Sequence, residues 1–536
     1  MPPRRLEMCR TPSFNTHGRR SVDAAAASTL ALEGVPRRSW IPLAATLLAA
    51  SLLAAAAADS TLGAEPAKSD SGAKVEPGLW EQDYAEPAAP ESTTGWGRHI
   101  QRTISMLADS RPEDRKQVRI LFYGQSITAQ KKWTDAVVAD LTRRFPHADV
   151  VYENRAIGGF SSQFLVHTAE ADVFPFCPDL MIFHVYGAHD DYQRLIHNVR
   201  SRSTAEIAIV TDHLGAKEFD GEKLVEADNW SKFMRGTFVP KVAQEYNAQL
   251  IDITTPWIQY LESHHLPSQA LLTDGIHPND HGCFLMSKLV ARQLIHRPDQ
   301  TADPQSEAMV TTHRVGDDIA FEDGKLSLTF KGTRVDLLAA PADAPAKLRV
   351  RVDGKDPSHF LSSYTHTRTS RCPGVAWPAL LHVQWNTLPL IEDWTLTVQE
   401  VNEPNTDFTF TVEGSKTGPD GRGNSKERFV SDSGRVVIEP KMWMNLERDY
   451  EFKKEPLTPG FRVTWSIRPL FVDPYQPVPI EDPAAESIAV LIQGLRAGEH
   501  TLELEVIGDG QPAVQSLRTH NPPVDRKLKI VANPPR

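Results

Sequence analysis

Residues 118–128 read VRILFYGQSIT, and this stretch decides the fold of the region around it. Its first six residues are apolar except for Arg119, with the length and composition of a strand buried on both faces of a parallel sheet. The following residues place a glycine and a serine where the strand ends, just before a segment of helical pattern. A strand that passes directly into a helix is the repeating unit of α/β domains, so the stretch predicts such a domain.

Four more short apolar runs follow in the next part of the chain: DVVYE (149–153), LMIFHV (180–185), EIAIVT (206–211) and QLIDI (249–253). Helix-length segments separate or follow them, at 133–145, 192–201, 231–246 and 282–295. Pro240 lies inside the third segment and should break or kink it, because proline has no N–H to donate. The alternation predicts a doubly wound parallel sheet ending near residue 297. Such sheets bind ligands beyond the carboxyl ends of their strands.

Beyond residue 311 the helical periodicity disappears and polarity alternates along short segments. Examples are KLSLTF (325–330), KLRVRVDG (347–354), DFTFTVEG (407–414) and EHTLELEV (499–506). This pattern is typical of antiparallel strands with one solvated face. It predicts a β-sandwich or jelly-roll domain over residues 310–536, in which 358–483 form a long insertion between the first and last strands.

The N-terminal 58 residues have the pattern of an export signal. Residues 41–58 read IPLAATLLAASLLAAAAA without a charge, and arginines precede this run. Small residues at its end favour cleavage as a signal peptide. The alternative is a retained membrane anchor, because the run is near the lower length limit of a spanning helix. Residues 59–97 have the composition of a linker, so the α/β domain is expected at 98–300 and the protein is expected to be exported.

Composition excludes several classes of protein. Hydrophobic residues make up 40% and charged residues 24% of the 536 residues, an ordinary globular balance. The 58 lysines and arginines are outnumbered by 69 aspartates and glutamates, giving a formal net charge of −11. This excess of acid argues against nucleic acid as a partner, because phosphate contacts need clustered positive charge. The four cysteines form no CxxC pair, which indicates neither a disulfide scaffold nor a zinc knuckle.

Chemically useful residues gather at the predicted strand ends. Ser126 follows the first strand and precedes a helix, whose free N–H groups can hold a developing oxyanion. Alone, a serine at such a place is more often a helix cap. The stretch DGIHPN (274–279) places Asp274 and His277 three residues apart. A carboxylate so placed can bind one imidazole nitrogen while the other faces a nucleophile, although such a pair in isolation is more often part of a plain polar loop.

Four segments together resemble the sequence blocks of the SGNH (GDSL-like) hydrolases: GQSIT (124–128), NRAIGG (154–159), GAHD (187–190) and DGIHPN (274–279). Order and spacing match, and the resemblance spans roughly residues 118–297. It implies a flavodoxin-like sheet and an ester-hydrolysing enzyme.

The resemblance also implies roles for individual residues. Ser126 would be the nucleophile, His277 the general base and then acid, and Asp274 the group that orients His277. The Ser126 amide and Gly159 would form the oxyanion hole, with a third donor at position 189.

Two positions depart from the family pattern. Gln125 stands where the family usually has aspartate, which should affect loop packing more than chemistry. His189 stands where the family usually has asparagine. A histidine can still donate one N–H, so His189 is a candidate oxyanion donor; the alternative is a loop histidine paired with Asp190 or Asp191.

The sequence is also compatible with two other classes of function. A metal hydrolase would draw its ligands from His189, Asp190, Asp191, Asp212, His213, Asp274 and His277. No HxH or HExxH spacing occurs, so no metal and no other cofactor is predicted. The second is an exported glycan-binding protein whose α/β domain has lost activity, which the histidine at 189 suggests.

Export, an acidic surface and an appended β-domain favour an ester on a polysaccharide, such as an acetylated glycan, as the substrate. A lipid or other small ester is the alternative substrate, and a membrane is a partner only if residues 41–58 are retained as an anchor. Because all the proposed catalytic groups lie in the α/β domain, residues 97–300 alone are expected to fold and hydrolyse a small ester.

Overall fold

The computed structural model describes residues 83–225, 229–298, 304–402, 407–444, 455–525 and 527–529. The expected signal peptide and most of the expected linker therefore lie outside the described residues. Within these ranges no helix is both long enough and apolar enough to cross a membrane.

The first region is the predicted α/β domain, built on a five-stranded parallel sheet of order β2-β1-β3-β4-β5. Its strands are β1 (Gln117–Gly124), β2 (Asp149–Asn154), β3 (Leu180–His184), β4 (Glu206–Val210) and β5 (Gln249–Ile251). All five coincide with the predicted apolar runs, and the order is that of a flavodoxin-like doubly wound sheet. The predicted fold class of this region is confirmed.

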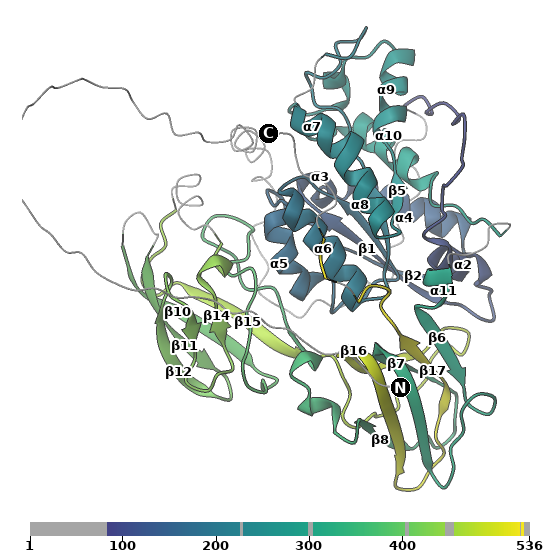
Figure 1. Ribbon diagram of the computed structural model, residues 1–536, viewed down its shortest axis with the longest axis vertical. Helices are drawn as coiled ribbons and strands as arrows, with labels where there is room; N and C mark the ends of the chain where they lie inside the picture. The colour runs from purple at the N-terminus through teal and green to yellow at the C-terminus, as the bar shows by residue number, and fades with distance from the viewer. Residues whose placement is uncertain are drawn as a thin grey trace, which may run out of the picture. The chain divides into compact units, whose positions relative to one another are not determined.

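Helices cover both faces of this sheet (Figure 1). The helices of this region are α2 (Gln101–Asp109), α3 (Ser126–Ala129), α4 (Lys132–Arg144), α5 (Ser162–Asp172), α6 (His189–Arg202), α7 (Asn229–Phe233), α8 (Val239–Glu245), α9 (Thr254–Ser263) and α10 (Asp280–Ala291). The short α11 (Pro304–Glu307) lies against α2 and β6. Along β1, Leu121 and Tyr123 share a core with α5, α6 and α8. Ile120 and Phe122 point the other way, into a core with α2, α4, α9 and α10. The alternation of side chains along a strand thus separates two cores.

The helix predicted at 231–246 is interrupted, as Pro240 suggested. Residues Met234–Phe238 form one turn of π-helix between α7 and α8. Pro240 lies in the first turn of α8, directly after this π-helical turn.

The second region is antiparallel, as predicted, but its described strands form two separate five-stranded sheets. The first has the order β6-β17-β7-β16-β8, with β6 (Val310–Arg314), β7 (Lys325–Ala339), β8 (Lys347–Val352), β16 (Ile488–Ile507) and β17 (Val514–His520). Its strands come from both sides of the insertion (residues 358–483), and alternate side chains such as Leu326, Leu348 and Leu502 fill its core.

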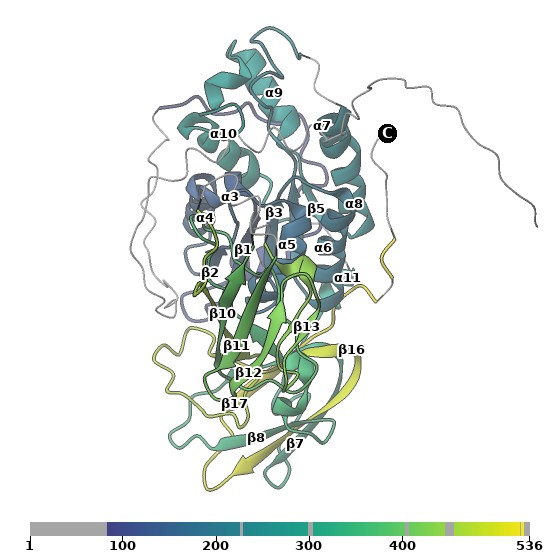
Figure 2. The same ribbon diagram turned by 90° about the vertical axis from the view of Figure 1, so that its left-hand side faces the viewer.

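The insertion forms the other sheet, of order β12-β11-β10-β15-β9. Its strands are β9 (Tyr364–His366), β10 (Asp393–Val401), β11 (Phe408–Gly414), β12 (Gly418–Asn424) and β15 (Arg462–Pro469), with a short hairpin of β13 (Phe429–Val430) and β14 (Val437–Ile438). Figure 2 shows β10, β11 and β12 side by side. The short helices η3 (Pro357–His359), η4 (Leu361–Ser363) and η5 (Pro440–Met442) accompany them.

The insertion shares its hydrophobic core with the α/β domain. Phe160 and Phe174 belong to the same buried cluster as Trp377, Trp394 and Phe410 of the insertion. The first β-sheet has a cluster of its own. The insertion is thus the part of the β-rich region whose apolar side chains are continuous with the helices α5 and α6.

Candidate active site

Ser126 stands just beyond the carboxyl end of β1, an interior strand of the sheet, as the first residue of α3. Gly124, two residues earlier, lies against β3 so closely that an added Cβ would be 2.1 Å from the His184 carbonyl oxygen. A side chain at 124 would therefore push apart the two strands that position the serine. The glycine of this motif is required by the close backbone approach.

The structure brings the three predicted triad residues together. His277 Nε2 lies 2.8 Å from Ser126 Oγ, and His277 Nδ1 lies 2.8 Å from Asp274 Oδ2. With Nδ1–H donating to the carboxylate, Nε2 is free to accept the serine proton. This is the arrangement of a nucleophile, a base and a group that orients the base.

Hydrogen bonds keep the Asp274 carboxylate ionised. Burial on its own would raise the pKa of Asp274, but hydrogen bonds from the His277 amide, the His277 ring and the Ile276 amide outweigh it, and the pKa is lowered. Both amides donate to Oδ1, at 2.9 Å and 3.1 Å. The carboxylate therefore presents its other oxygen as a charged acceptor to the imidazole of His277.

The loop that carries Asp274 and His277 is closed on itself and capped. The Thr273 amide donates to the His277 carbonyl oxygen at 2.8 Å. Asn279 caps α10: its side-chain oxygen accepts a hydrogen bond from the Gly282 backbone N–H at 3.0 Å. Its side-chain Nδ2 donates to the Ala270 carbonyl oxygen at 2.9 Å. The asparagine of DGIHPN thus fixes the end of the loop and the start of α10.

A second histidine, His213, forms a hydrogen bond to the backbone of this loop. His213 is buried, and its Nε2 lies 2.7 Å from the Ile276 carbonyl oxygen, so Nε2 carries the proton and donates it. Burial lowers the pKa of His213 to about 4, which keeps the ring neutral. Nearby, His184 Nε2 lies 3.0 Å from Asp212 Oδ1. The sequence grouped Asp212 and His213 with possible metal ligands; it held no signal for the contact with Ile276.

In the described part of the chain, no group of three or more histidine, cysteine, aspartate or glutamate side chains is placed to hold a metal ion.

The glycine pair of NRAIGG lies beside the serine. A Cβ added to Gly158 would be 3.9 Å from Ser126 Cβ, and Gly159 has φ +79°, a conformation that favours glycine. Among the described residues, the N–H groups of Ser126, Gly158 and Gly159 have no acceptor. These donors therefore remain available to a bound oxyanion.

His189 occupies a different kind of environment. It opens α6, is 6% exposed, and packs against Trp230, Phe233 and Phe238 with ring centroids 5.7, 5.1 and 4.6 Å away. Burial lowers the pKa of His189, so the ring is neutral near pH 7. Its Nε2 is buried and has no hydrogen-bond partner among the described residues. Its role as an oxyanion donor stays a prediction.

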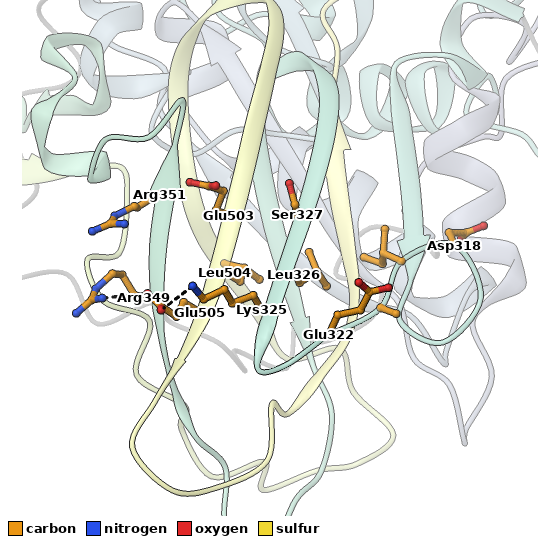
Figure 3. A pocket seen from close by; sticks show the side chains of 12 residues that line it. Asp318, Glu322, Lys325, Leu326, Ser327, Arg349, Arg351, Glu503, Leu504 and Glu505 are labelled. Carbon is orange, nitrogen blue, oxygen red and sulfur yellow. Dashed lines mark hydrogen bonds and ion pairs between the residues drawn. The ribbon is translucent and has the colours of Figure 1, made fainter.

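A hollow of about 530 Å³ lies elsewhere, on the sheet of β7, β8 and β16 (Figure 3). Three of its charged side chains pair with one another: Glu505 lies 3.4 Å from Lys325 Nζ and 3.0 Å from Arg349 Nη1. None of its lining residues is aromatic, so it offers no platform for stacking a sugar ring. We assign no chemistry to it.

Comparison with known proteins gives structural likeness but no sequence family. No protein-family model and no curated protein matches the chain. A solved two-domain esterase active on acetylated mannans is 14% identical, with a TM-score of 0.30 over 79% of this chain and 95% of its own. An acetylxylan esterase from Geobacillus stearothermophilus is 18% identical, with a TM-score of 0.30 over 34% of this chain and 97% of its own.

An α/β hydrolase from the metagenome of Lake Arreo, Spain, is 18% identical, with a TM-score of 0.29 over 34% of this chain and 98% of its own. At these identities and TM-scores the likeness carries no argument about activity.

Proposed function

We propose that this chain is an exported SGNH-type serine esterase that hydrolyses carboxylic esters, with O-acetyl groups on a polysaccharide as the substrate class. The observation that carries the proposal is the continuous hydrogen-bonded line from Asp274 through His277 to Ser126, at 2.8 Å for each step. The exported location rests on the charge-free run at residues 41–58.

The first half of the reaction follows from these contacts. Ser126 Oγ attacks the ester carbonyl carbon while its proton passes to His277 Nε2. The negative charge that develops on the carbonyl oxygen is held by the N–H groups of Ser126 and Gly159. When the intermediate collapses, His277 returns the proton to the leaving alcohol oxygen, and the acyl group stays on Ser126.

The second half uses the same groups on water. His277 Nε2 takes a proton from a water molecule, which attacks the acyl carbon of the ester on Ser126. The second oxyanion is held in the same place, and its collapse returns the proton to Ser126 Oγ and releases the acid. Throughout, Asp274 keeps the His277 ring in one orientation and stabilises its cation.

Two measurements test the proposal. A fluorophosphonate should label Ser126, and Ser126→Ala should remove both the label and the esterase activity. A panel of acetylated glycans compared with short-chain nitrophenyl esters should then show the higher kcat/KM on a glycan. Labelling at another residue, with Ser126→Ala still active, would remove the assignment, and binding of glycans without hydrolysis would favour the inactive binding protein.

A further inference from the structure

We propose that Trp377, a residue of the insertion, is a positioning residue for the oxyanion hole beside Ser126. The inference rests on the proposed esterase function and extends it: the β-rich region sets the direction and strength of a donor in the active site.

Trp377 makes a direct hydrogen bond to the loop next to the nucleophile. Its Nε1–H donates to the Gly158 carbonyl oxygen at 2.8 Å, although the two residues are 219 positions apart in the sequence. The side chain is 3% exposed, and its ring lies 6.2 Å from the ring of Phe160. The indole is therefore packed in the interior.

The geometry of the peptide unit gives this bond its consequence for Gly159. The Gly158 carbonyl and the Gly159 N–H belong to one planar trans peptide, so they point in opposite directions. A donor that fixes the carbonyl oxygen therefore also fixes the direction of the N–H. Because hydrogen bonds in a chain polarise one another, a donor on the Gly158 oxygen also makes the Gly159 N–H a stronger donor.

The loop needs such a support because two adjacent glycines have more conformational freedom than any other pair. Ring atoms of Trp377 also fill the space beside Gly159: an added Cβ there would be 2.9 Å from Trp377 Cζ2. The indole thus limits the loop both through its N–H and through its face.

Trp377 is itself firmly held by the insertion. The turn that carries it is closed by a hydrogen bond from the Cys372 amide to the Trp377 carbonyl oxygen at 2.8 Å. Arg368 of the insertion contacts the other end of the loop, where its guanidinium donates to the Arg155 carbonyl oxygen. The same guanidinium forms two hydrogen bonds to the Asp172 carboxylate at the end of α5, at 2.6 and 2.9 Å. The loop from Arg155 to Gly159 is therefore bounded at both ends by insertion side chains.

Two variants separate the N–H from the ring. Trp377→Phe removes the donor and keeps an aromatic ring, and Trp377→Ala removes both. On a small nitrophenyl ester we expect Trp377→Phe to lower kcat about 10-fold, because a weakened donor costs less than the 10²–10³ typical of a lost one. Trp377→Ala should lower kcat about 10²-fold, the size of effect that a displaced catalytic group produces. KM should change by less than about 2-fold, since the oxyanion contact forms in the transition state.

Trp385→Phe is the matched control. Trp385 lies in the same insertion, and its Nε1–H donates to the Leu361 carbonyl oxygen at 3.0 Å. The Trp385→Phe substitution removes the same kind of indole hydrogen bond, but far in sequence from the glycine loop and without a hydrogen bond to it. The kcat of this variant should therefore equal that of the wild type. A boronic acid that forms a tetrahedral adduct with Ser126 should bind more weakly to Trp377→Phe by the same factor as kcat falls.

All rates are expressed per Ser126 titrated with a fluorophosphonate, which counts only folded, competent molecules. A loss of kcat that vanishes after this correction would show a structural role alone and overturn the proposal, as would equal kcat in Trp377→Phe and Trp385→Phe. If the wild-type chain neither hydrolyses esters nor labels at Ser126, the proposed function fails first, and this inference fails with it.

Discussion

His213 gives a test in which both sign and size follow from the structure. Burial lowers its pKa to about 4, whereas a histidine in the unfolded chain titrates near 6.5. Between these values the unfolded state binds more protons than the folded state, so the free energy of unfolding falls as the pH is lowered. The contribution of the neutral His213 ring to the free energy of unfolding is fully present above pH about 6.5 and is lost progressively toward pH about 4.

The size of the effect follows from the same two values. At pH 5 the His213 ring accounts for a loss of about 2 kcal/mol relative to pH 8, and the full loss at pH 4 approaches about 3 kcal/mol. His213→Gln has no charge to gain and can still donate an amide N–H to the Ile276 carbonyl oxygen. The variant should therefore resist acid better than the wild type, with similar stability at pH 8.

Urea unfolding at pH 8 and pH 5, for the wild type and His213→Gln, measures this difference. His147→Gln, which replaces an exposed histidine, serves as the control and should keep the pH dependence of the wild type. Equal losses of stability in the wild type and His213→Gln between the two pH values would refute the buried neutral ring. His213→Ala should additionally lower kcat, because the loop of His277 loses the donor beneath it.

The remaining predictions concern the site and the domain boundary. His277→Ala should abolish most turnover, whereas Asp274→Asn should leave more residual activity, because the carboxylate only orients and stabilises the imidazole. A near-native kcat in the histidine variant would contradict the assignment of His277 as the base. If His189 is an oxyanion donor, His189→Ala should lower kcat by about 10²–10³. His189→Asn should keep activity and remove from the pH–rate profile an ionisation below pH about 6.5. An unchanged kcat and pH profile in the alanine variant would exclude the role. A protein truncated to residues 97–300 should be insoluble or inactive, because it exposes the hydrophobic core shared with the insertion and lacks the Trp377 N–H that binds the Gly158 carbonyl oxygen. A soluble truncated protein with the full kcat would refute this prediction.

The parallel sheet could be predicted from the sequence because each strand is buried on both faces. A run such as LMIFHV at 180–185 has no polar face to confuse its pattern, and the observed β3 is buried along its whole length. Asp274 and His277 could be predicted because they are close in sequence and belong to the DGIHPN stretch, which resembles a block of the SGNH hydrolases. Ser126 follows β1, an interior strand flanked by β2 and β3, and only the fold of the whole domain brings it to the loop of Asp274 and His277.

Helix α5 was not predicted, and its surroundings explain why. Its sequence, SQFLVHTAEAD, has no clear polar stripe, and most of its residues are buried, among them Leu165, Ala169 and Asp172. A surface helix shows amphipathic periodicity because one face meets water. Here the insertion packs over the exposed side, where Arg368 pairs with Asp172. The helix could not be recognised because its second partner comes from a distant part of the chain.

The same argument explains why Trp377 carried no signal in the sequence. It lies in the loop GVAWPALL (374–381), where a tryptophan before a proline suggests nothing more than local packing. Its partner Gly158 belongs to a motif that reads as complete without it, since the N–H donors of the oxyanion hole are backbone groups. Backbone donors have no side chain that fixes their direction, so whatever holds the peptide must come from outside the motif. In this chain the outside support is a side chain of the insertion: the Trp377 indole N–H donates to the Gly158 carbonyl oxygen, and residues 97–300 alone lack this donor.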